Sequence, residues 1–436
     1  MVAAHEVKAV IGRHLLADGM DIIVDLENSK GSWLVDKRNG DRYLDCFSMF
    51  ASMAIGFNHD GILAIADELG RIAIHKPANS DAYSEPMAEF VQTFAEHAMP
   101  AYLPHVFFIE GGALAVENAL KAAFDWKVKK NFDRGTKMEL GSKIIHFRQA
   151  FHGRTGYTLS LTNTADPRKT QYFPKFSWPR IVNPKLTFPL TEKRLAEVAA
   201  VEKDALSAIL EHLDRDGEDI AGLILEPIQG EGGDNHFRQE FFKALREICD
   251  QHEILFILDE VQTGAGLTGK FWAHEHYGIE PDLVSFGKKT QVCGILGSRR
   301  LDEIADNVFT EPSRINSTFG GNLVDMVRCS AILKIIHKEN LVDNACRRGA
   351  ELLQGLEALA QEFPDIIDNA RGRGLMCAFD LQDTEKRNSF RSKLYAEKLL
   401  VVGCGDKSIR FRPHLIITQE EVQMILDILR KAAKEL

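Results

Sequence analysis

The sequence contains no apolar run close to the roughly 18 consecutive residues that a membrane-spanning helix needs. Its first residues, MVAAHEVKAVIGRH, also lack the apolar segment of a signal peptide. Lysine and arginine form no block and the formal net charge is −10, so the electrostatic signature of a protein that binds nucleic acid or an anionic membrane is missing. We therefore expect a cytoplasmic protein without nucleic-acid or membrane partners.

Cysteine is also sparse. The seven cysteines are scattered, no two form a C-x-x-C pair, and none has a nearby histidine at metal-ligand spacing. This pattern favours reduced thiols and predicts no metal site. Cys293 lies close to Lys288 and is a candidate catalytic thiol, although a buried structural thiol is the preferred interpretation.

The chain does contain the pattern of an α/β protein. Of its 436 residues, 45% are hydrophobic and 27% are charged, as in folded globular proteins. Short apolar runs typical of buried parallel strands occur at 106–109, 144–147, 222–225 and 254–258. Helical patterns lie between them, so the sequence predicts an α/β domain with a mainly parallel sheet.

The pattern changes near residue 320. A long helical stretch is followed by two predicted strands, at 374–381 and 408–418, which are typical of a small α+β unit. Thr418 and Glu421 have the spacing of a capping box and predict the start of the last helix.

Polar residues follow three apolar runs directly. They are EPIQGEGG at 226–233, DEVQTG at 259–264, and the two lysines that end PDLVSFGKK at 281–289. Ligands of open parallel sheets bind outside the carboxyl ends of the strands, so carboxylate, amide and lysine groups are expected to converge there. This is the combination that a pyridoxal 5′-phosphate (PLP) enzyme requires.

Each of these groups has a chemical reason to be present. A lysine amine forms a Schiff base with PLP and later moves a proton at the substrate carbon. Asp259 would face the pyridine nitrogen and keep the ring protonated. The phosphate needs backbone N–H donors, and Gly112 and Ala113 stand where a predicted helix begins. A simple turn and helix cap would show the same glycine pair.

Over nearly its whole length the chain resembles the class III, or ω-amino-acid, aminotransferases, and the lysine ε-aminotransferase branch in particular. The motifs that carry this resemblance are GGALAVENALKAAFDWK, AFHGRTGYTLSLTNT, EPIQGEGG, LDEVQTG, PDLVSFGKKTQ and NSTFGGN. The family implies PLP-dependent transferase fold type I, with a seven-stranded, mainly parallel sheet. The large domain is expected over 61–318, and a small α+β domain over 319–436 together with 1–60.

The resemblance also implies roles for single residues at the cofactor. The motif P-D-x-x-[ST]-x-x-K places the Schiff-base lysine at Lys288, with Lys289 as its nearest rival or as a surface or phosphate-side charge. Phe151 is expected to stack on the ring with His152 beside it. Gln262 is expected to donate to the phenolic oxygen. Thr318 matches the residue that reaches the phosphate of the neighbouring subunit, which implies a homodimer, although an ordinary turn would look the same.

Three further residues correspond to the substrate site of the family. Arg154 is assigned to the carboxylate held far from the cofactor, and Arg410 to the α-carboxylate of glutamate or 2-oxoglutarate. Glu231 is assigned to mask Arg410 while an ω-amine donor is bound. Arg410 and Arg412 are taken to alternate on an edge strand, with Arg410 as the one that faces the site.

These assignments predict transfer of the ε-amino group of L-lysine to 2-oxoglutarate by a ping-pong mechanism. An ornithine, acetylornithine or 4-aminobutyrate aminotransferase is the alternative within the family. A PLP-binding regulator without turnover is more remote, because residues 1–50 are too short and not basic enough for a DNA-binding module. The segment KTQVCG after Lys288, where relatives are glycine-rich, and GGNL in place of GGNP bear on substrate choice.

Overall fold

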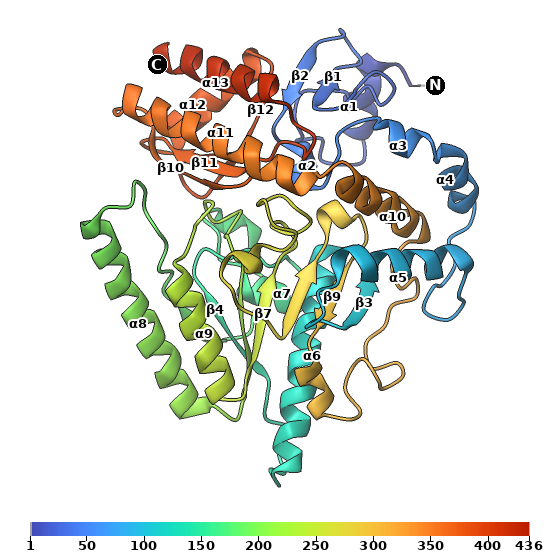
Figure 1. Ribbon diagram of the computed structural model, residues 1–436, viewed down its shortest axis with the longest axis vertical. Coiled ribbons are helices and arrows are strands. Elements are labelled where there is room, and N and C mark those ends of the chain that lie inside the picture. The colour runs from blue at the N-terminus through green and yellow to red at the C-terminus, as the bar shows by residue number, and fades with distance from the viewer. Residues whose placement is uncertain (1, 436) are drawn as a thin grey trace.

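The computed structural model of the chain describes residues 2–435. A seven-stranded sheet occupies one half of the molecule and two smaller sheets lie in the other (Figure 1). The strands of the large sheet lie in the order β3-β9-β8-β7-β6-β4-β5. Their bounds are β3 (His105–Ile109), β4 (Lys143–Phe147), β5 (Arg180–Ile181), β6 (Ile220–Leu225), β7 (Leu255–Asp259), β8 (Leu283–Phe286) and β9 (Cys293–Gly297).

Most of this sheet is parallel. The strands β5, β4, β6, β7 and β8 run in one direction, whereas β9 is antiparallel to both of its neighbours. The strand at 106–109, β3, runs in the same direction as these five strands, but it pairs with β9 and so its pairing is antiparallel and not parallel as expected. The segment 287–292 between β8 and β9 is too short for a crossover helix, so β9 turns back beside β8.

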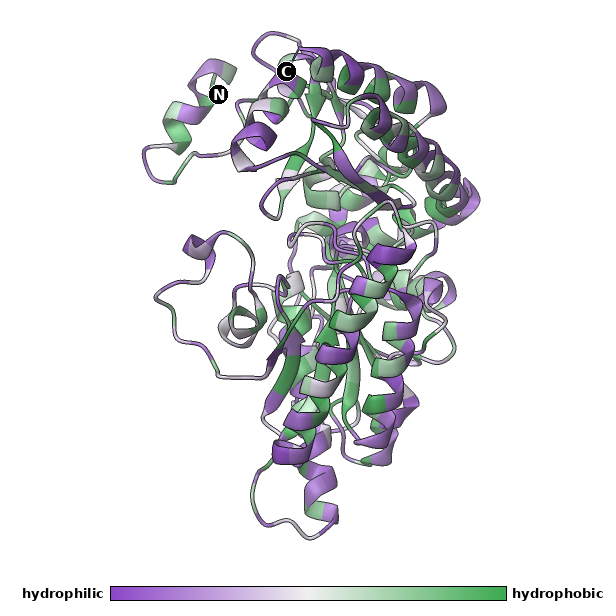
Figure 2. Ribbon diagram, turned by 90° about the vertical axis from the view of Figure 1, so that its left-hand side faces the viewer, coloured by the Kyte–Doolittle hydropathy of each residue, from purple (hydrophilic) through white to green (hydrophobic). Residues whose placement is uncertain are grey.

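Helices cover both faces of the large sheet. Alternate residues of β6 point to opposite sides, so Leu223 packs in a cluster with helices α8 (Glu192–Asp216) and α9 (Gln239–Gln251), whereas Ile224 packs with α6 (Gly112–Asp133). Figure 2 shows hydrophobic strands in the centre and hydrophilic residues along the outer sides of the long helices. This arrangement confirms the predicted α/β class with a seven-stranded, mainly parallel sheet.

The smaller sheets bring the two ends of the chain together. One has the antiparallel order β10-β11-β14-β13, and in the other β12 pairs in parallel with β2, which also pairs with β1. Their bounds are β1 (Trp33–Val35), β2 (Arg42–Asp45), β10 (Asp368–Arg373), β11 (Met376–Asp380), β12 (Leu399–Leu400), β13 (Val402–Cys404) and β14 (Ser408–Phe411). The domain limits at residues 60 and 318 remain a prediction.

The strand predicted over 408–418 was too long and was placed wrongly in its sheet. The strand β14 ends at Phe411, and the chain then leaves the sheet near Pro413, which has no N–H to donate. Moreover, β14 lies between β11 and β13 and is not an edge strand. By contrast, the capping box is confirmed, because Thr418 Oγ1 accepts the Glu421 N–H at 3.2 Å and Glu421 Oε2 accepts the Thr418 N–H at 3.0 Å.

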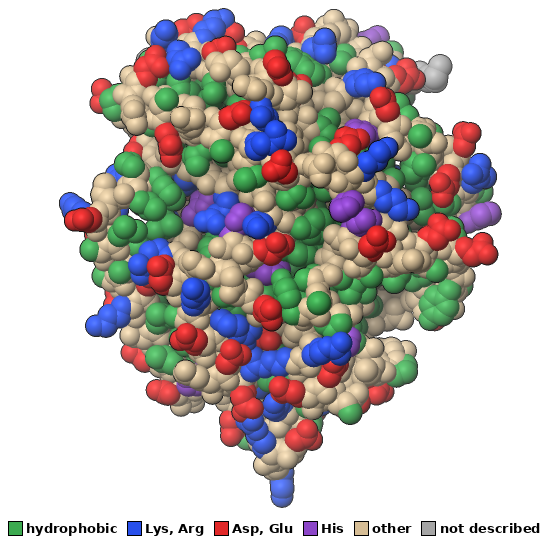
Figure 3. All heavy atoms as spheres, viewed as in Figure 1, with side chains coloured by type: hydrophobic (Ala, Val, Ile, Leu, Met, Phe, Trp, Pro, Cys, Tyr) green, Lys and Arg blue, Asp and Glu red, His purple; other side chains and the backbone are tan. Residues whose placement is uncertain are grey.

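The remaining helices lie around these sheets. They are α1 (Val7–Ile11), α2 (Ser48–Ala51), α3 (Asp60–Leu63), α4 (Ala66–Ala73), α5 (Glu85–Ala98), α7 (Gly156–Leu161), α10 (Leu323–Lys338), α11 (Leu341–Glu362), α12 (Thr384–Ala396) and α13 (Gln419–Lys434). Within residues 2–435, none of the helices combines the length and the apolar character needed to cross a bilayer. On the face shown in Figure 3, acidic and basic side chains are interspersed.

Candidate active site

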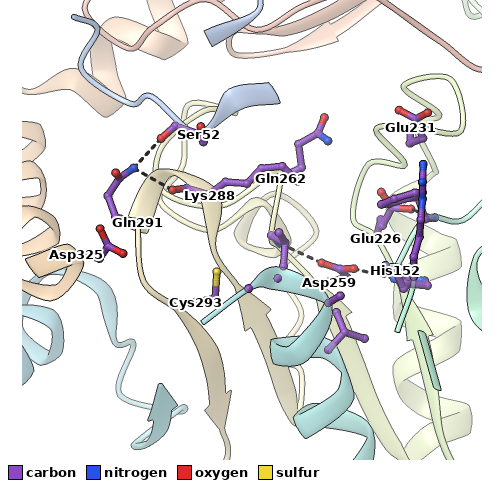
Figure 4. Close-up of a pocket in the computed structure, with 18 residues that line it drawn as sticks. Ser52, His152, Glu226, Glu231, Asp259, Gln262, Lys288, Gln291, Cys293 and Asp325 are labelled. Carbon is purple, nitrogen blue, oxygen red and sulfur yellow. Dashed lines mark hydrogen bonds and ion pairs between the residues drawn. The ribbon is translucent and has the colours of Figure 1, made fainter. Parts of the chain in front are cut away.

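A cavity of about 600 Å³ opens at the carboxyl ends of β6, β7 and β8 (Figure 4). The predicted residues that line it are Gly112, Ala113, Phe151, His152, Arg154, Glu231, Asp259, Gln262 and Lys288. Arg410 lines an adjoining cavity that shares Glu231 with the first. Thr318 lines neither cavity and is exposed within residues 2–435.

Asp259 is held in place at the end of β7. Its Oδ2 lies 2.7 Å from Nδ1 of His152, and its Oδ1 accepts the main-chain N–H of Val261 at 3.1 Å. Asp259 and His152 are 5% and 2% exposed, and a buried carboxylate is stabilised by such partners. His152 thus contacts the carboxylate and fixes its orientation.

The two adjacent lysines occupy different environments. Lys288 lines the cavity, and burial lowers the pKa of its amine, which favours the neutral, nucleophilic form. Lys289 is 2% exposed and its Nζ donates to the main-chain carbonyl of Gln262 at 2.8 Å. Burial holds the pKa of Lys289 well below its usual range. The interpretation of Lys289 as a surface charge is wrong, because its side chain is buried, whereas a phosphate-side position stays a prediction.

The start of α6 forms another wall of the cavity. The helix begins at Gly112, directly after Gly111, whose φ of 98° suits glycine. The loop with Phe151 lies against this helix start. Gly153 has φ of 119°, and a Cβ there would lie 2.5 Å from Cβ of Ala113. The close approach of loop and helix therefore requires glycine at position 153.

Glu226 is a cavity residue that the sequence analysis did not single out. It follows β6 directly, is 5% exposed, and accepts the main-chain N–H groups of Phe151 at 2.9 Å and Gly230 at 3.0 Å. Burial, with a contribution from Asp259, raises the pKa of Glu226 to about 7. It ties the Phe151 loop to the 226–233 segment. Glu226 could have been identified from the sequence, because it is the first residue after the apolar run at 222–225.

Gln262 is oriented by Arg412, which was expected to face away from the site. Arg412 is 1% exposed and donates to Oε1 of Gln262 from Nε at 3.0 Å and from Nη2 at 2.9 Å, while it also pairs with Asp234. Positions 410 and 412 are two residues apart, so both side chains extend to the same side. Because Oε1 is held by Arg412, the amide N–H₂ of Gln262 is left for a ligand in the cavity.

Glu231 and Arg154 add charged side chains to the lining of the cavity. Glu231 Oε2 accepts from Nη2 of Arg410 at 3.0 Å, and its Oε1 accepts from Nζ of Lys169. Arg154 is exposed to the cavity, with its guanidinium carbon 6.0 Å from the centroid of the Phe151 ring. One guanidinium, that of Arg410, is therefore paired with Glu231, whereas the more exposed guanidinium of Arg154 lines the same cavity as Glu231.

Cys293 has the environment of a structural thiol. Its side chain lines the cavity but is only 7% exposed, and burial raises the pKa of the thiol. A thiol with a raised pKa is a weak nucleophile.

The residues around the cavity fit PLP by their chemistry. A lysine amine, a buried carboxylate, an aromatic ring and a helix N-terminus with two glycines would meet the aldehyde, the ring nitrogen, the ring face and the phosphate respectively. The donor set therefore suits this cofactor.

Comparison with known proteins agrees with this chemistry. The chain is 50% identical over 431 residues to the L-lysine-epsilon aminotransferase of Amycolatopsis lactamdurans, covering 98% of this chain and 95% of that protein. It is 34% identical over 433 residues to human mitochondrial 4-aminobutyrate aminotransferase, covering 94% and 85% of the two. The solved structure of the lysine aminotransferase from M. tuberculosis in the internal aldimine form superposes with a TM-score of 0.96 at 49% identity, over 99% of each chain.

Residues 16–433 match the family described as aminotransferase class III. This match covers almost the whole chain, and the two relatives compared above are aminotransferases. The chain therefore belongs to the class III aminotransferases.

Proposed function

We propose that this enzyme transfers the ε-amino group of L-lysine to 2-oxoglutarate. The observation that carries the proposal is the pairing of Glu231 with Arg410 at 3.0 Å beside a cavity that Arg154 also lines. Within residues 2–435, the Arg410 guanidinium is paired with a carboxylate and the Arg154 guanidinium is not, which suits an enzyme that binds a monocarboxylate donor and a dicarboxylate acceptor in turn. The 50% identity to an L-lysine-epsilon aminotransferase supports it.

As a class III aminotransferase, the protein uses PLP. When bound, PLP supplies a carbonyl that links to amines and a ring that accepts electrons from the substrate carbon. Lys288 is proposed to hold the cofactor covalently and to move the proton at the ε-carbon of the donor. Asp259, oriented by His152, is proposed to hold the proton on the ring nitrogen.

Four further residues are proposed to bind the cofactor non-covalently. The main-chain N–H groups of Gly112 and Ala113 suit the phosphate, and Phe151 suits the face of the ring. Gln262 suits the phenolic oxygen, because Arg412 leaves only its N–H₂ group free to face a ligand.

The substrates are proposed to use the two arginines in turn. Arg154 binds the α-carboxylate of lysine, so that the ε-amine extends toward Lys288, while Glu231 neutralises Arg410. When 2-oxoglutarate binds, Glu231 releases Arg410, which takes the α-carboxylate of the acceptor. The products are L-glutamate and 2-aminoadipate 6-semialdehyde, which cyclises to piperideine-6-carboxylate with loss of water.

Donor profiling tests this assignment. We expect the holoenzyme to convert L-lysine with a kcat/KM at least about tenfold above that for ornithine, acetylornithine or 4-aminobutyrate, because only lysine places both the carboxylate and the amine correctly. Half-reaction absorbance changes with each donor measure this ratio. Faster conversion of another donor would assign the enzyme to that alternative, and no conversion of lysine would refute the proposal.

We also propose that two subunits complete each site. Thr318 does not line the cavity of its own chain and is exposed. Ser80 Oγ donates to the main-chain carbonyl of Thr318 at 3.2 Å. Tyr172, Phe173 and Phe176 are 93%, 56% and 52% exposed, as at a protein interface. Thr318 is proposed to reach the PLP phosphate of the partner subunit.

Removal of the Thr318 hydroxyl tests this assembly. Thr318→Ala is expected to raise the Kd for PLP about tenfold, the effect of one lost hydrogen bond to a charged group. Titration of the apoenzyme with PLP measures it, and light scattering should show a dimer for both proteins. A monomeric wild type, or an unchanged Kd, would contradict this role.

A further inference from the structure

Glu231 contacts two cations at once. Its Oε2 accepts from Nη2 of Arg410 at 3.0 Å, and its other oxygen accepts from Nζ of Lys169. Lys169 ends a short 3₁₀ helix, Pro167–Lys169, far from Arg410 in the sequence. Glu231 therefore lies between Lys169, in the half that holds the seven-stranded sheet, and Arg410, in the four-stranded sheet.

The two cations differ in exposure. The Arg410 side chain is 3% exposed and extends from β14, and within residues 2–435 its Nε and Nη1 atoms find no hydrogen-bond partner. The Lys169 side chain is 21% exposed and that of Glu231 23%. Arg410 thus keeps N–H groups that can donate to a carboxylate, whereas Lys169 has a long, flexible side chain that can follow Glu231.

The surroundings limit where Glu231 can go. Its main-chain carbonyl accepts the N–H of Gly405 at 2.9 Å, so a movement is confined to the side chain. Beside it is a polar hollow of about 430 Å³, lined by Lys169, Arg387 and Arg391 together with Asp166 and Asp406. A Glu231 carboxylate that leaves Arg410 therefore enters a region where cations are available.

We propose that Lys169 is a specificity-determining positioning residue that keeps Glu231 paired after Glu231 has left Arg410. Before the acceptor binds, Glu231 neutralises Arg410. Afterwards, the α-carboxylate of the acceptor pairs with Arg410, and Lys169 retains Glu231. Because an unpaired, partly buried carboxylate is costly, Lys169 lowers the free energy needed to unmask Arg410. This inference rests on the proposed function, in which the α-carboxylate of the acceptor replaces Glu231 at Arg410.

Lys169→Met tests this role in the holoenzyme. We expect the KM for 2-oxoglutarate to rise about fivefold, as for a partly exposed ion pair, while the half-reaction with L-lysine changes less than about twofold. Binding of glutarate, a five-carbon dicarboxylate that cannot react, should weaken by the same factor in calorimetry. Lys169→Arg should restore both values.

Lys175 provides the matched control. It lies in the same loop and its Nζ donates to the carbonyls of Thr170 and Phe173, not to Glu231. Lys175→Met should leave glutarate binding unchanged. An unchanged or lower KM for 2-oxoglutarate in Lys169→Met, or equal losses in both half-reactions, would overturn the role of Lys169. A wild type that does not use 2-oxoglutarate would instead refute the proposed function itself.

Discussion

Lys288→Ala is expected to lower the rate of transamination by at least about 10⁴-fold. The lysine amine both holds the cofactor and moves the substrate proton, and a positioned proton-transfer group alone contributes about 10²–10⁴-fold. Lys288 lines the cavity, and burial lowers the pKa of its amine, which favours the neutral form needed for both tasks. Single-turnover absorbance measurements with L-lysine give the rate.

Folding must be checked in the same variant. Lys288 follows β8 and has φ of 55°, so thermal unfolding of Lys288→Ala should be compared with that of the wild type. Lys288→Arg keeps the charge but not the nucleophile, and it should be equally inactive. More than about one hundredth of the wild-type rate in a folded Lys288→Ala protein would show that another group does this chemistry.

Asp259→Asn is expected to lower kcat/KM about 10²–10³-fold, the effect of removing one preorganised charge from a buried site. Asparagine has the same shape but cannot keep the ring nitrogen protonated. The hydrogen bond between position 259 and Nδ1 of His152, 2.7 Å from Asp259 Oδ2, also loses its carboxylate acceptor. Steady-state rates and the absorbance spectrum of bound PLP report the effect.

Asp259→Glu separates charge from shape. It retains the carboxylate on a longer side chain, so we expect it to keep at least about tenfold more activity than Asp259→Asn. If the asparagine variant is the more active of the two, the geometry of the His152 contact matters more than the negative charge, and the proposed role of Asp259 is wrong.

Much of the fold and of the candidate site could be predicted because it depends on patterns within short segments of the sequence. The apolar runs of β4, β6 and β7 are buried on both faces, so they were recognisable without partners. Polar residues at the carboxyl ends of the strands, such as Asp259 at the end of β7, lie at the edge of the sheet where ligands bind. For this reason the sequence placed Lys288 and Asp259 at one edge of the sheet.

The remaining features depend on contacts between distant segments. The antiparallel direction of β9 follows from a connection too short for a helix, which the apolar pattern does not reveal. Lys169 meets Glu231 through a loop with no regular periodicity. Arg412 could have been placed beside Arg410 from its spacing of two, but its contact with Gln262 joins residues 150 positions apart.

Borohydride reduction of the PLP-loaded enzyme, followed by peptide mapping, tests the central claim most directly. Reduction fixes PLP to the amine that carries it, and Lys288 and Lys289 lie in one peptide that fragmentation can resolve. Lys289 donates to the carbonyl of Gln262 at 2.8 Å and does not line the cavity. We predict the pyridoxyl label on Lys288 alone, and a label on Lys289 or on any other residue would contradict the site described above.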